Sequence, residues 1–161
     1  MAVNCIQRYG ERTVITTLFQ HNGETNPPNS VDPDRPHELK HYIAVLDDND
    51  DIRSLLRTML ERDYIVEDFD NAAGLLELLR QKPCDLIVSD LSIPDMDGFD
   101  FIAALKRDSR LASIPVVALT GSGSVETRRM ALGLGFVAYL VKPPSLEQLL
   151  SVIVQHLRKP V

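Results

Sequence analysis

From His41 onward, short apolar runs alternate with segments that carry a helical stripe of apolar residues. Most of the runs contain no polar residue until they end, a pattern typical of strands buried on both faces of a parallel sheet. The clearest stripe comprises Leu146, Leu149, Leu150, Ile153, Val154 and Leu157. This strict alternation predicts an α/β fold with five parallel strands, right-handed crossovers and helices on both faces.

The expected elements can be placed along the sequence. We expect strands over 42–46, 65–69, 86–89, 116–119 and 138–141. We expect helices from Asn49 or Asp50 to about Leu60, and over 71–81, 99–107, 125–132 and 145–157.

Four of the apolar runs end at a polar side chain. The contexts AVLDD, LIVSD, VVALT and AYLVK end at Asp48, Asp90, Thr120 and Lys142. Ligands of open α/β sheets bind at the carboxyl edge, where the ends of parallel strands meet. We therefore expect carboxylates, a hydroxyl and an ammonium to converge there, a set that suits a divalent cation and a phosphoryl group.

The acidic residues at this edge indicate a magnesium site, with Mn²⁺ as a possible substitute. Mg²⁺ takes oxygen ligands, usually one or two carboxylates with water and phosphate oxygens. Asp48 and Asp90 would supply carboxylates, Asp47 would bind directly or through water, and Ser92 would offer its backbone carbonyl. The alternative for Asp47 and Asp48 is a solvated helix start, where acids favour the helix dipole.

Asp90 is the predicted nucleophile. A carboxylate there can attack a phosphoryl group and form an acyl phosphate. Lys142 would supply a fixed positive charge on the side opposite the cation, and Thr120 would donate a hydrogen bond to a phosphoryl oxygen. Taken singly, Lys142 could be an ordinary solvated lysine and Thr120 an ordinary strand residue.

Composition excludes several other classes of protein. The net charge of −6 argues against direct nucleic-acid binding, which needs an excess of Lys and Arg. Cys5 and Cys84 are too few for a disulfide framework or a zinc site. No stretch reaches the roughly 18 apolar residues of a membrane span, and the polar start lacks the apolar core of a signal peptide. We expect a cytoplasmic protein without membrane insertion.

The first 40 residues differ in character from the rest. They contain a β-prone patch from Thr13 to Phe19, then a polar, Pro-rich stretch from Asn22 to Lys40. We expect residues 1–40 to be an extension or linker, partly disordered, and 41–161 to be the folded domain. The alternative is a strand or arm that packs on the domain or on a second copy. The sequence ends at Val161 without room for an output domain, which predicts a stand-alone domain or a fragment of a longer protein.

From about Lys40 to Arg158 the chain resembles the receiver domain of bacterial two-component response regulators. The matching segments are AVLDDND, DLIVSDLSIPDMDGFDFI, IPVVALTGSG and GFVAYLVKPPSLEQLL. The steps of 42 residues from Asp48 to Asp90, 30 to Thr120 and 22 to Lys142 are those the family uses. The P-x-M-D-G segment and the K-P-P step make the resemblance specific. It implies a doubly wound, flavodoxin-like sheet with strand order 2-1-3-4-5.

The resemblance also implies a mechanism. Asp90 would be phosphorylated by a sensor histidine kinase or a phosphotransfer protein, with Asp47 and Asp48 as the acid pair. Thr120, Gly121 and Lys142 would bind the phosphoryl group, and Gly121 would keep the site open. The domain would catalyse only its own phosphorylation and dephosphorylation, and would not act as an enzyme on other substrates.

The family further implies how the signal leaves the site. Thr120 and Tyr139 would form the switch, and the peptide bond from Lys142 to Pro143 would be cis. The fourth helix, fifth strand and last helix would dock a downstream effector or a second copy. Without the resemblance, Tyr139 could equally be an ordinary strand aromatic.

Three other functions are compatible with parts of the sequence. A degenerate receiver could serve only as an interaction scaffold. The presence of all five polar site residues argues against this; they are Asp47, Asp48, Asp90, Thr120 and Lys142. A metal-dependent phosphatase usually has a second acid two residues after its nucleophile, where this chain has Ser92. A flavin- or nucleotide-binding protein of the same fold would need a Gly-rich loop after the first strand, and none is found.

Overall fold

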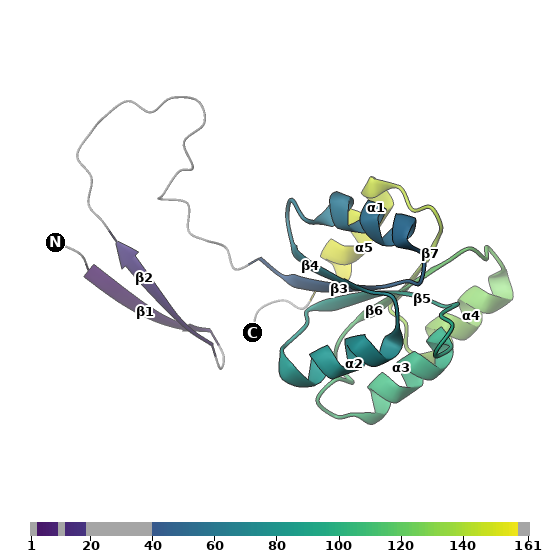
Figure 1. The fold of residues 1–161 in the computed structure, drawn as a ribbon, viewed down its shortest axis with the longest axis horizontal. Helices are drawn as coiled ribbons and strands as arrows, with labels where there is room; N and C mark the ends of the chain where they lie inside the picture. The colour runs from purple at the N-terminus through teal and green to yellow at the C-terminus, as the bar shows by residue number, and fades with distance from the viewer. Residues whose placement is uncertain (1–2, 10–11, 19–39, 158–161) are drawn as a thin grey trace. The chain divides into compact units, whose positions relative to one another are not determined.

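The computed structural model describes residues 3–9, 12–18 and 40–157. The chain divides into two units, Met1–Glu38 with Lys159–Val161, and Leu39–Arg158. The first unit contains an antiparallel pair, β1 (Val3–Tyr9) and β2 (Arg12–Leu18), in which Val3 lies opposite Leu18 (Figure 1). Strand β2 overlaps the β-prone patch expected from the sequence, whereas β1 was not expected. Residues 19–39, which hold most of the Pro-rich stretch, lie outside the described residues.

The second unit is built on a sheet of five parallel strands. These are β3 (Tyr42–Leu46), β4 (Ile65–Phe69), β5 (Leu86–Asp90), β6 (Val116–Thr120) and β7 (Ala138–Val141). Their order across the sheet is β4-β3-β5-β6-β7, so the expected order 2-1-3-4-5 is confirmed. The two innermost neighbours, β3 and β5, pair from Ile43 opposite Leu86 to Leu46 opposite Ser89.

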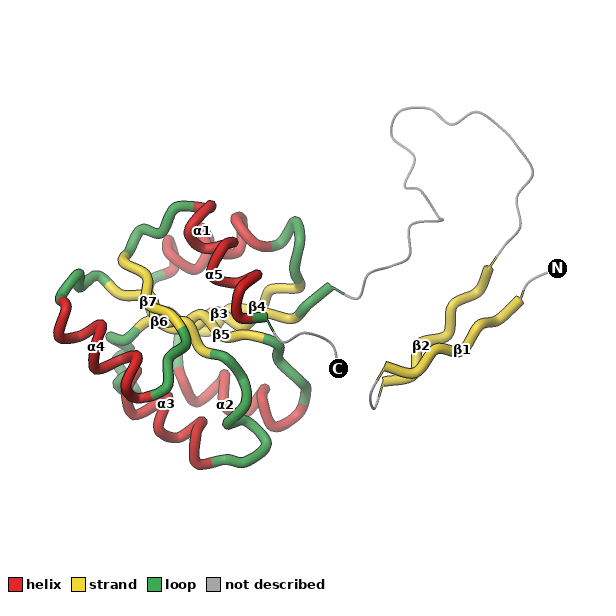
Figure 2. Tube along the Cα trace, turned by 180° about the vertical axis from the view of Figure 1, so that it is seen from behind, coloured by secondary structure: helices red, strands yellow, loops and turns green. Residues whose placement is uncertain are grey.

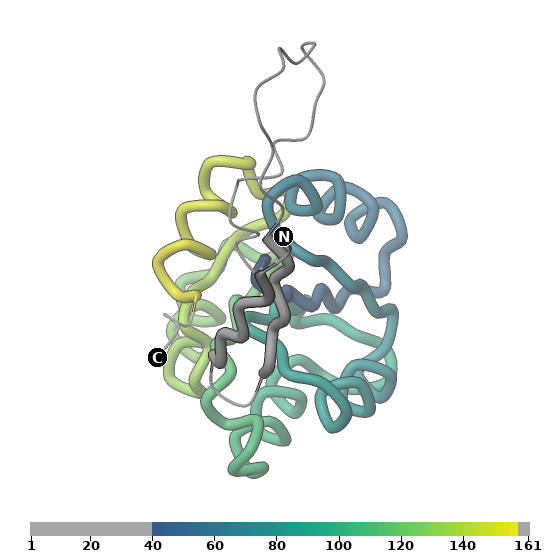
Figure 3. Tube along the Cα trace, turned by 90° about the vertical axis from the view of Figure 1, so that its left-hand side faces the viewer, coloured from purple at the N-terminus to yellow at the C-terminus, as the bar shows by residue number. Residues whose placement is uncertain are grey.

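Five helices cover the sheet on both faces. They are α1 (Asp50–Leu60), α2 (Ala72–Gln81), α3 (Gly98–Arg107), α4 (Val125–Leu134) and α5 (Leu146–His156). Helices α1 and α5 cover one face, and α2, α3 and α4 cover the other (Figures 1 and 2). Figure 3 shows the layers from the side. No helix in the described ranges is long and apolar enough to cross a membrane.

The core explains why the inner strands are largely apolar. Ile43 and Val45 point to one face of β3 and pack with Leu56 and other side chains of α1 and α5. Ala44 and Leu46 point to the opposite face, toward α2 and α3. The edge strand β4 (IVEDF) differs, because it carries two half-buried acids. Since side chains of a strand alternate between faces, an inner strand covered on both faces is apolar at most positions. Burying one such large side chain stabilises the fold by about 1.5–3 kcal/mol.

Each helix begins near the carboxyl edge of the sheet, with a capped N-terminus. The residues whose side chains accept from the first turn are Asn49, Asn71, Asp97, Ser124 and Ser145. Such caps contribute about 1 kcal/mol each by satisfying free backbone N–H groups. The strand ends and the helix starts therefore lie at one edge, where the polar residues singled out from the sequence are found.

Candidate functional site

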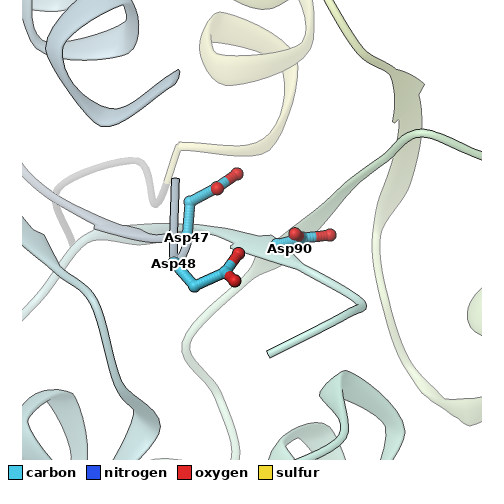
Figure 4. A group of neighbouring side chains, drawn as sticks. All are labelled: Asp47, Asp48 and Asp90. Carbon is cyan, nitrogen blue, oxygen red and sulfur yellow. The ribbon is translucent and has the colours of Figure 1, made fainter. Parts of the chain in front are cut away.

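Three carboxylates meet where β3 and β5 end. Asp47 and Asp48 follow β3, Asp90 is the last residue of β5, and each contributes an oxygen within 4.8 Å of the other two (Figure 4). Asp47 and Asp90 are buried, whereas Asp48 is exposed. The pairing of Leu46 with Ser89 explains the proximity, because the residues that follow lie side by side at the sheet edge.

Lys142, just after β7, places its ammonium between two of these acids. Its Nζ atom lies 2.5 Å from Oδ2 of Asp47 and 2.8 Å from Oδ2 of Asp90, and its side chain is 16% exposed. Burial opposes the charged form, but the contacts with Asp47 and Asp90 outweigh it and raise the pKa of Lys142. The sequence placed Lys142 opposite the cation; in the structure it pairs directly with two of the predicted metal ligands.

The remaining oxygens of the two buried acids differ in their partners. Oδ1 of Asp47 accepts a hydrogen bond from the Asn49 amide at 3.0 Å, and Oδ1 of Asp90 accepts one from the Ser92 amide at 3.1 Å. Oδ2 of Asp47 is buried and faces the Lys142 ammonium at 2.5 Å, the same ammonium that contacts Oδ2 of Asp90.

These acids fit a divalent cation. Three carboxylates meet here, and the single positive charge of the Lys142 ammonium offsets only part of their negative charge. A hard cation bound by carboxylate oxygens would offset the rest. The cluster of Asp47, Asp48 and Asp90 could therefore hold a metal ion. The Ser92 amide holds the main chain of that residue beside Asp90, which is the region where a backbone carbonyl ligand was expected.

Thr120 and Tyr139 are joined through the loop after β6. Thr120 is buried at the end of β6, and its Oγ1 atom accepts from the Ser122 amide at 3.2 Å. The Tyr139 hydroxyl donates to the Ser122 carbonyl at 2.5 Å, and Tyr139 is buried. One peptide segment at Ser122 therefore contacts both residues expected to form the switch.

The backbone at Thr120 and Lys142, and the residue that follows each of them, form the rest of the site next to β6 and β7. The Lys142 amide donates to the Thr120 carbonyl at 2.8 Å, which ties the end of β7 to β6. Gly121 is exposed, and a side chain there would meet no atom within 4 Å. The peptide bond from Lys142 to Pro143 is cis.

The sequence reasoning missed the role of Gly98, although it quoted the P-x-M-D-G segment that contains this residue. A Cβ atom on Gly98 would lie 2.7 Å from Cα of Leu91 and 2.8 Å from the carbonyl oxygen of Asp90. The Gly98 amide donates to the Leu91 carbonyl at 3.0 Å. Only a residue without a side chain allows α3 to begin this close to the backbone of Asp90.

Arg53 on α1 was also missed. Its guanidinium donates to the backbone carbonyl of Asp47 at 2.7 Å and to Oδ2 of Asp68 at 3.2 Å, and it also contacts Asp50. In the sequence it is one of several polar residues on an amphipathic helix, and the helical pattern alone gives no sign of these contacts.

Comparisons with known proteins assign this chain to a family. Residues 43–154 match the model of the response regulator receiver domain, so the chain belongs to that family. A solved structure similar to this chain is chemotaxis protein CheY4 from Vibrio cholerae. The two are 28% identical with a TM-score of 0.69, over 73% of this chain and 99% of CheY4.

Curated relatives share the domain in proteins of different lengths. An uncharacterized 14.6 kDa protein of Leptolyngbya boryana is 39% identical over 71% of this chain and 88% of the relative. The transcriptional regulatory protein GltR of Pseudomonas aeruginosa is 35% identical over 73% of this chain. The match covers 49% of GltR, so the shared part is about half of that relative.

Proposed function

We propose that residues 41–161 act as a signalling switch that is phosphorylated on Asp90, and that residues 1–40 are an extension of it. The single observation that carries this proposal is the convergence of Asp47, Asp48 and Lys142 on the Asp90 carboxylate. Membership of the receiver family supports the class of reaction, and the positions of these side chains support the proposed roles.

Mg²⁺, or Mn²⁺ in its place, is the proposed cofactor. The residues that would hold it are Asp47, Asp48 and Asp90, with the carbonyl of Ser92. When bound, the cation would neutralise negative charge on the phosphoryl oxygens. The convergence of three carboxylates, each with an oxygen within 4.8 Å of the other two, supports this assignment.

The phosphotransfer step follows from the position of Asp90. One carboxylate oxygen attacks the phosphorus of a phosphohistidine on a sensor kinase or phosphotransfer protein. The new bond joins that oxygen to phosphorus, the phosphorus–nitrogen bond breaks, and the leaving imidazole takes a proton. Lys142 pairs with Oδ2 of Asp90 before the reaction, and its charge then faces the oxygens of the acyl phosphate. Thr120 and the open position at Gly121 would complete the binding of the phosphoryl group.

The proposed switch passes through Ser122. Phosphorylation adds nearly two negative charges and new acceptor oxygens. A phosphoryl oxygen would accept a hydrogen bond from the Thr120 hydroxyl and draw it toward Asp90, and Oγ1 of Thr120 now also accepts from the Ser122 amide. Movement of the hydroxyl would therefore pull on the Ser122 segment. Because Tyr139 bonds the Ser122 carbonyl, movement of this segment would change the position that Tyr139 prefers.

The output surface is the one formed by α4, β7 and α5, and its partner is an effector protein or a second copy. Exposed apolar side chains on this surface favour protein contact. They include Val125, Leu132, Val141, Leu146 and Val154, of which Val125 is 81% exposed. The net charge of −6 favours a protein partner over nucleic acid. We place the switch in the cytoplasm, and propose that it acts on no substrate other than its own phosphoryl group.

Incubation with Mg²⁺ and acetyl phosphate, followed by intact mass spectrometry, tests the proposal. We expect one phosphoryl adduct in the wild type and none in Asp90→Asn. The matched control is Asp97→Asn, an acid in the loop after Asp90 that caps α3 and should leave the adduct intact. Absence of the adduct with this donor and with histidine-kinase donors would favour the scaffold reading. Steady release of phosphate from added monoesters would favour the phosphatase.

A further inference from the structure

The turn that carries the acid pair is fixed by its own main chain. The Asp47 amide donates to the carbonyl of Phe69 at 3.0 Å, which anchors it to the end of β4. The Asp47 carbonyl accepts from Nη1 of Arg53 at 2.7 Å. The Asp47 side chain accepts from the Asn49 amide at 3.0 Å. The peptide groups on both sides of Asp47 are therefore held, and with them the directions of the Asp47 and Asp48 side chains.

The groups that hold Asp47 here are the Phe69 carbonyl, the Asn49 amide and the Arg53 guanidinium, so Arg53 is the one that acts through its side chain. It is only 13% exposed, and its guanidinium uses three different nitrogen atoms for three different acceptors. Nε donates to Oδ2 of Asp68 on β4, Nη1 donates to the carbonyl of Asp47, and Nη2 contacts Oδ1 of Asp50. The planar fork of arginine holds all three acceptors in fixed directions, whereas a lysine ammonium is a point charge on a flexible stem.

We propose that Arg53 is a positioning residue for the acidic pair, acting on the metal site through the backbone carbonyl of Asp47. The inference rests on the proposed function, because the proposed cation site contains Asp47 and Asp48. Arg53 does not touch the cation or the phosphoryl group in this scheme. It joins β4 to the turn after β3, so that both acids keep the orientation that cation binding requires.

Arg53 could affect the cation site as a nearby positive charge or as a group that orients the ligands. These two effects predict opposite changes in Mg²⁺ affinity when Arg53 is removed. Removing a positive charge beside a cation site strengthens cation binding, because like charges repel. Removing a group that orients ligands weakens it, and loss of such supporting partners costs about 10–100-fold in metal affinity. The sign of the change in Mg²⁺ affinity therefore separates the two effects.

Arg57 offers a matched control. It lies one helical turn beyond Arg53 on α1, is 47% exposed and pairs with Oδ1 of the same Asp68. Within residues 40–157, no hydrogen bond or ion pair joins the Arg57 side chain to the 47–49 turn. Arg57→Met therefore removes one positive charge and one contact with Asp68, as Arg53→Met does, but leaves the turn in place.

The experiment titrates Mg²⁺ alone into the full chain and measures its dissociation constant by calorimetry or by amide chemical shifts. We expect Arg53→Met to weaken binding about 10-fold, Arg57→Met to leave it unchanged or tighter, and Arg53→Lys to lie between Arg53→Met and wild type. Thermal unfolding of each apo variant checks that it is folded, and Arg53→Lys carries the test if Arg53→Met does not fold.

Two outcomes overturn the inference in distinguishable ways. If wild type binds Mg²⁺ and both Arg53 variants bind as tightly or more tightly, Arg53 does not position the acids, and the proposed function stands. If wild type binds no Mg²⁺ at all, the proposed function loses its cofactor, and the inference falls with it.

Discussion

The Lys142 ammonium donates a 2.8 Å hydrogen bond to Oδ2 of Asp90, joining the end of β7 to the end of β5 across β6. The same ammonium lies 2.5 Å from Asp47, so two buried acids share one positive charge. Removing this ammonium leaves both buried carboxylates without their shared positive partner. Breaking a buried ion pair by removing one member is strongly destabilising.

Lys142→Met should therefore destabilise the metal-free protein by about 3 kcal/mol at neutral pH. The folded-state pKa of Lys142 is raised, so its contribution is complete below the unfolded lysine pKa of about 10.4. The contribution is lost as the pH rises through the higher folded value. Urea unfolding from pH 7 to 11 should show a constant gap between wild type and variant that narrows only above about pH 10.4. A gap that shrinks between pH 7 and 9 would contradict this assignment.

Gly98→Ala should destabilise the fold by about 1–3 kcal/mol, because its Cβ would lie 2.7 Å from the backbone of Leu91. It should also slow phosphorylation from acetyl phosphate, since relief of the clash moves the backbone of Asp90. The control is Gly133→Ala on α4, where a Cβ meets no atom within 4 Å. That change should be neutral or stabilise the helix by up to about 1 kcal/mol. Equal effects of the two substitutions in urea unfolding would rule out the packing argument.

Mg²⁺ should stabilise the wild type through linkage, by about 2.7 kcal/mol at a concentration 100 times its dissociation constant. Asp48→Asn should remove most of this gain. It should change the metal-free stability little, because Asp48 is exposed. Asp51→Asn, which changes an exposed acid on α1, serves as the control and should keep the gain. The measurement is thermal unfolding with Mg²⁺ or with EDTA. The metal site is not the one described if Asp48→Asn keeps the full shift.

Tyr139→Phe should cost about 1 kcal/mol, the net value of one hydrogen bond, because the Ser122 carbonyl loses its donor. The variant should still form the phosphoryl adduct, but the chemical shifts of the 121–124 loop should respond differently to phosphorylation. Tyr64→Phe, a half-buried tyrosine just before β4, is the control. An unchanged loop response in Tyr139→Phe would exclude Tyr139 from the switch.

Val154→Lys should abolish self-association of the phosphorylated protein without a change in stability beyond about 0.5 kcal/mol. Val154 is 68% exposed on α5, within the proposed output surface. The control is Ile65→Lys on β4, at the other edge of the sheet, where Ile65 is 52% exposed. Light scattering with and without acetyl phosphate measures the oligomeric state. A phosphorylated wild type that stays monomeric would eliminate the second copy and leave the effector as partner.

Much of the sheet could be predicted from the sequence because burial on both faces leaves a clear pattern. Every residue from Tyr42 to Leu46 is buried. A short, uninterrupted apolar run of this kind is typical of a strand buried on both faces. The same pattern placed Asp47, Asp48 and Asp90 at one edge, since the ends of neighbouring parallel strands must lie together. Strand β1 was missed because VNCIQRY mixes polar and apolar residues without a clean alternation.

The supporting contacts of the site could not be predicted in this way. Arg53 reaches the carbonyl of Asp47 because of the direction that one side chain takes from α1, which periodicity does not specify. Ser122 joins Thr120 to Tyr139 through its backbone, so its side-chain identity carries no signal. The double contact of Lys142 depends on where the loop after β7 places the ammonium.

All five residues of β3 and of β5 are buried, whereas residues 121–126 after β6 are all exposed. Backbone amides in the first group should exchange with deuterium only on global unfolding, and those in the second should exchange through local opening. The acids thus follow rigid strands, while the loop proposed to respond to phosphorylation can rearrange without disturbing the core. Selection for a faster or slower response can therefore act on the loop sequence alone and leave the architecture that holds the acids untouched.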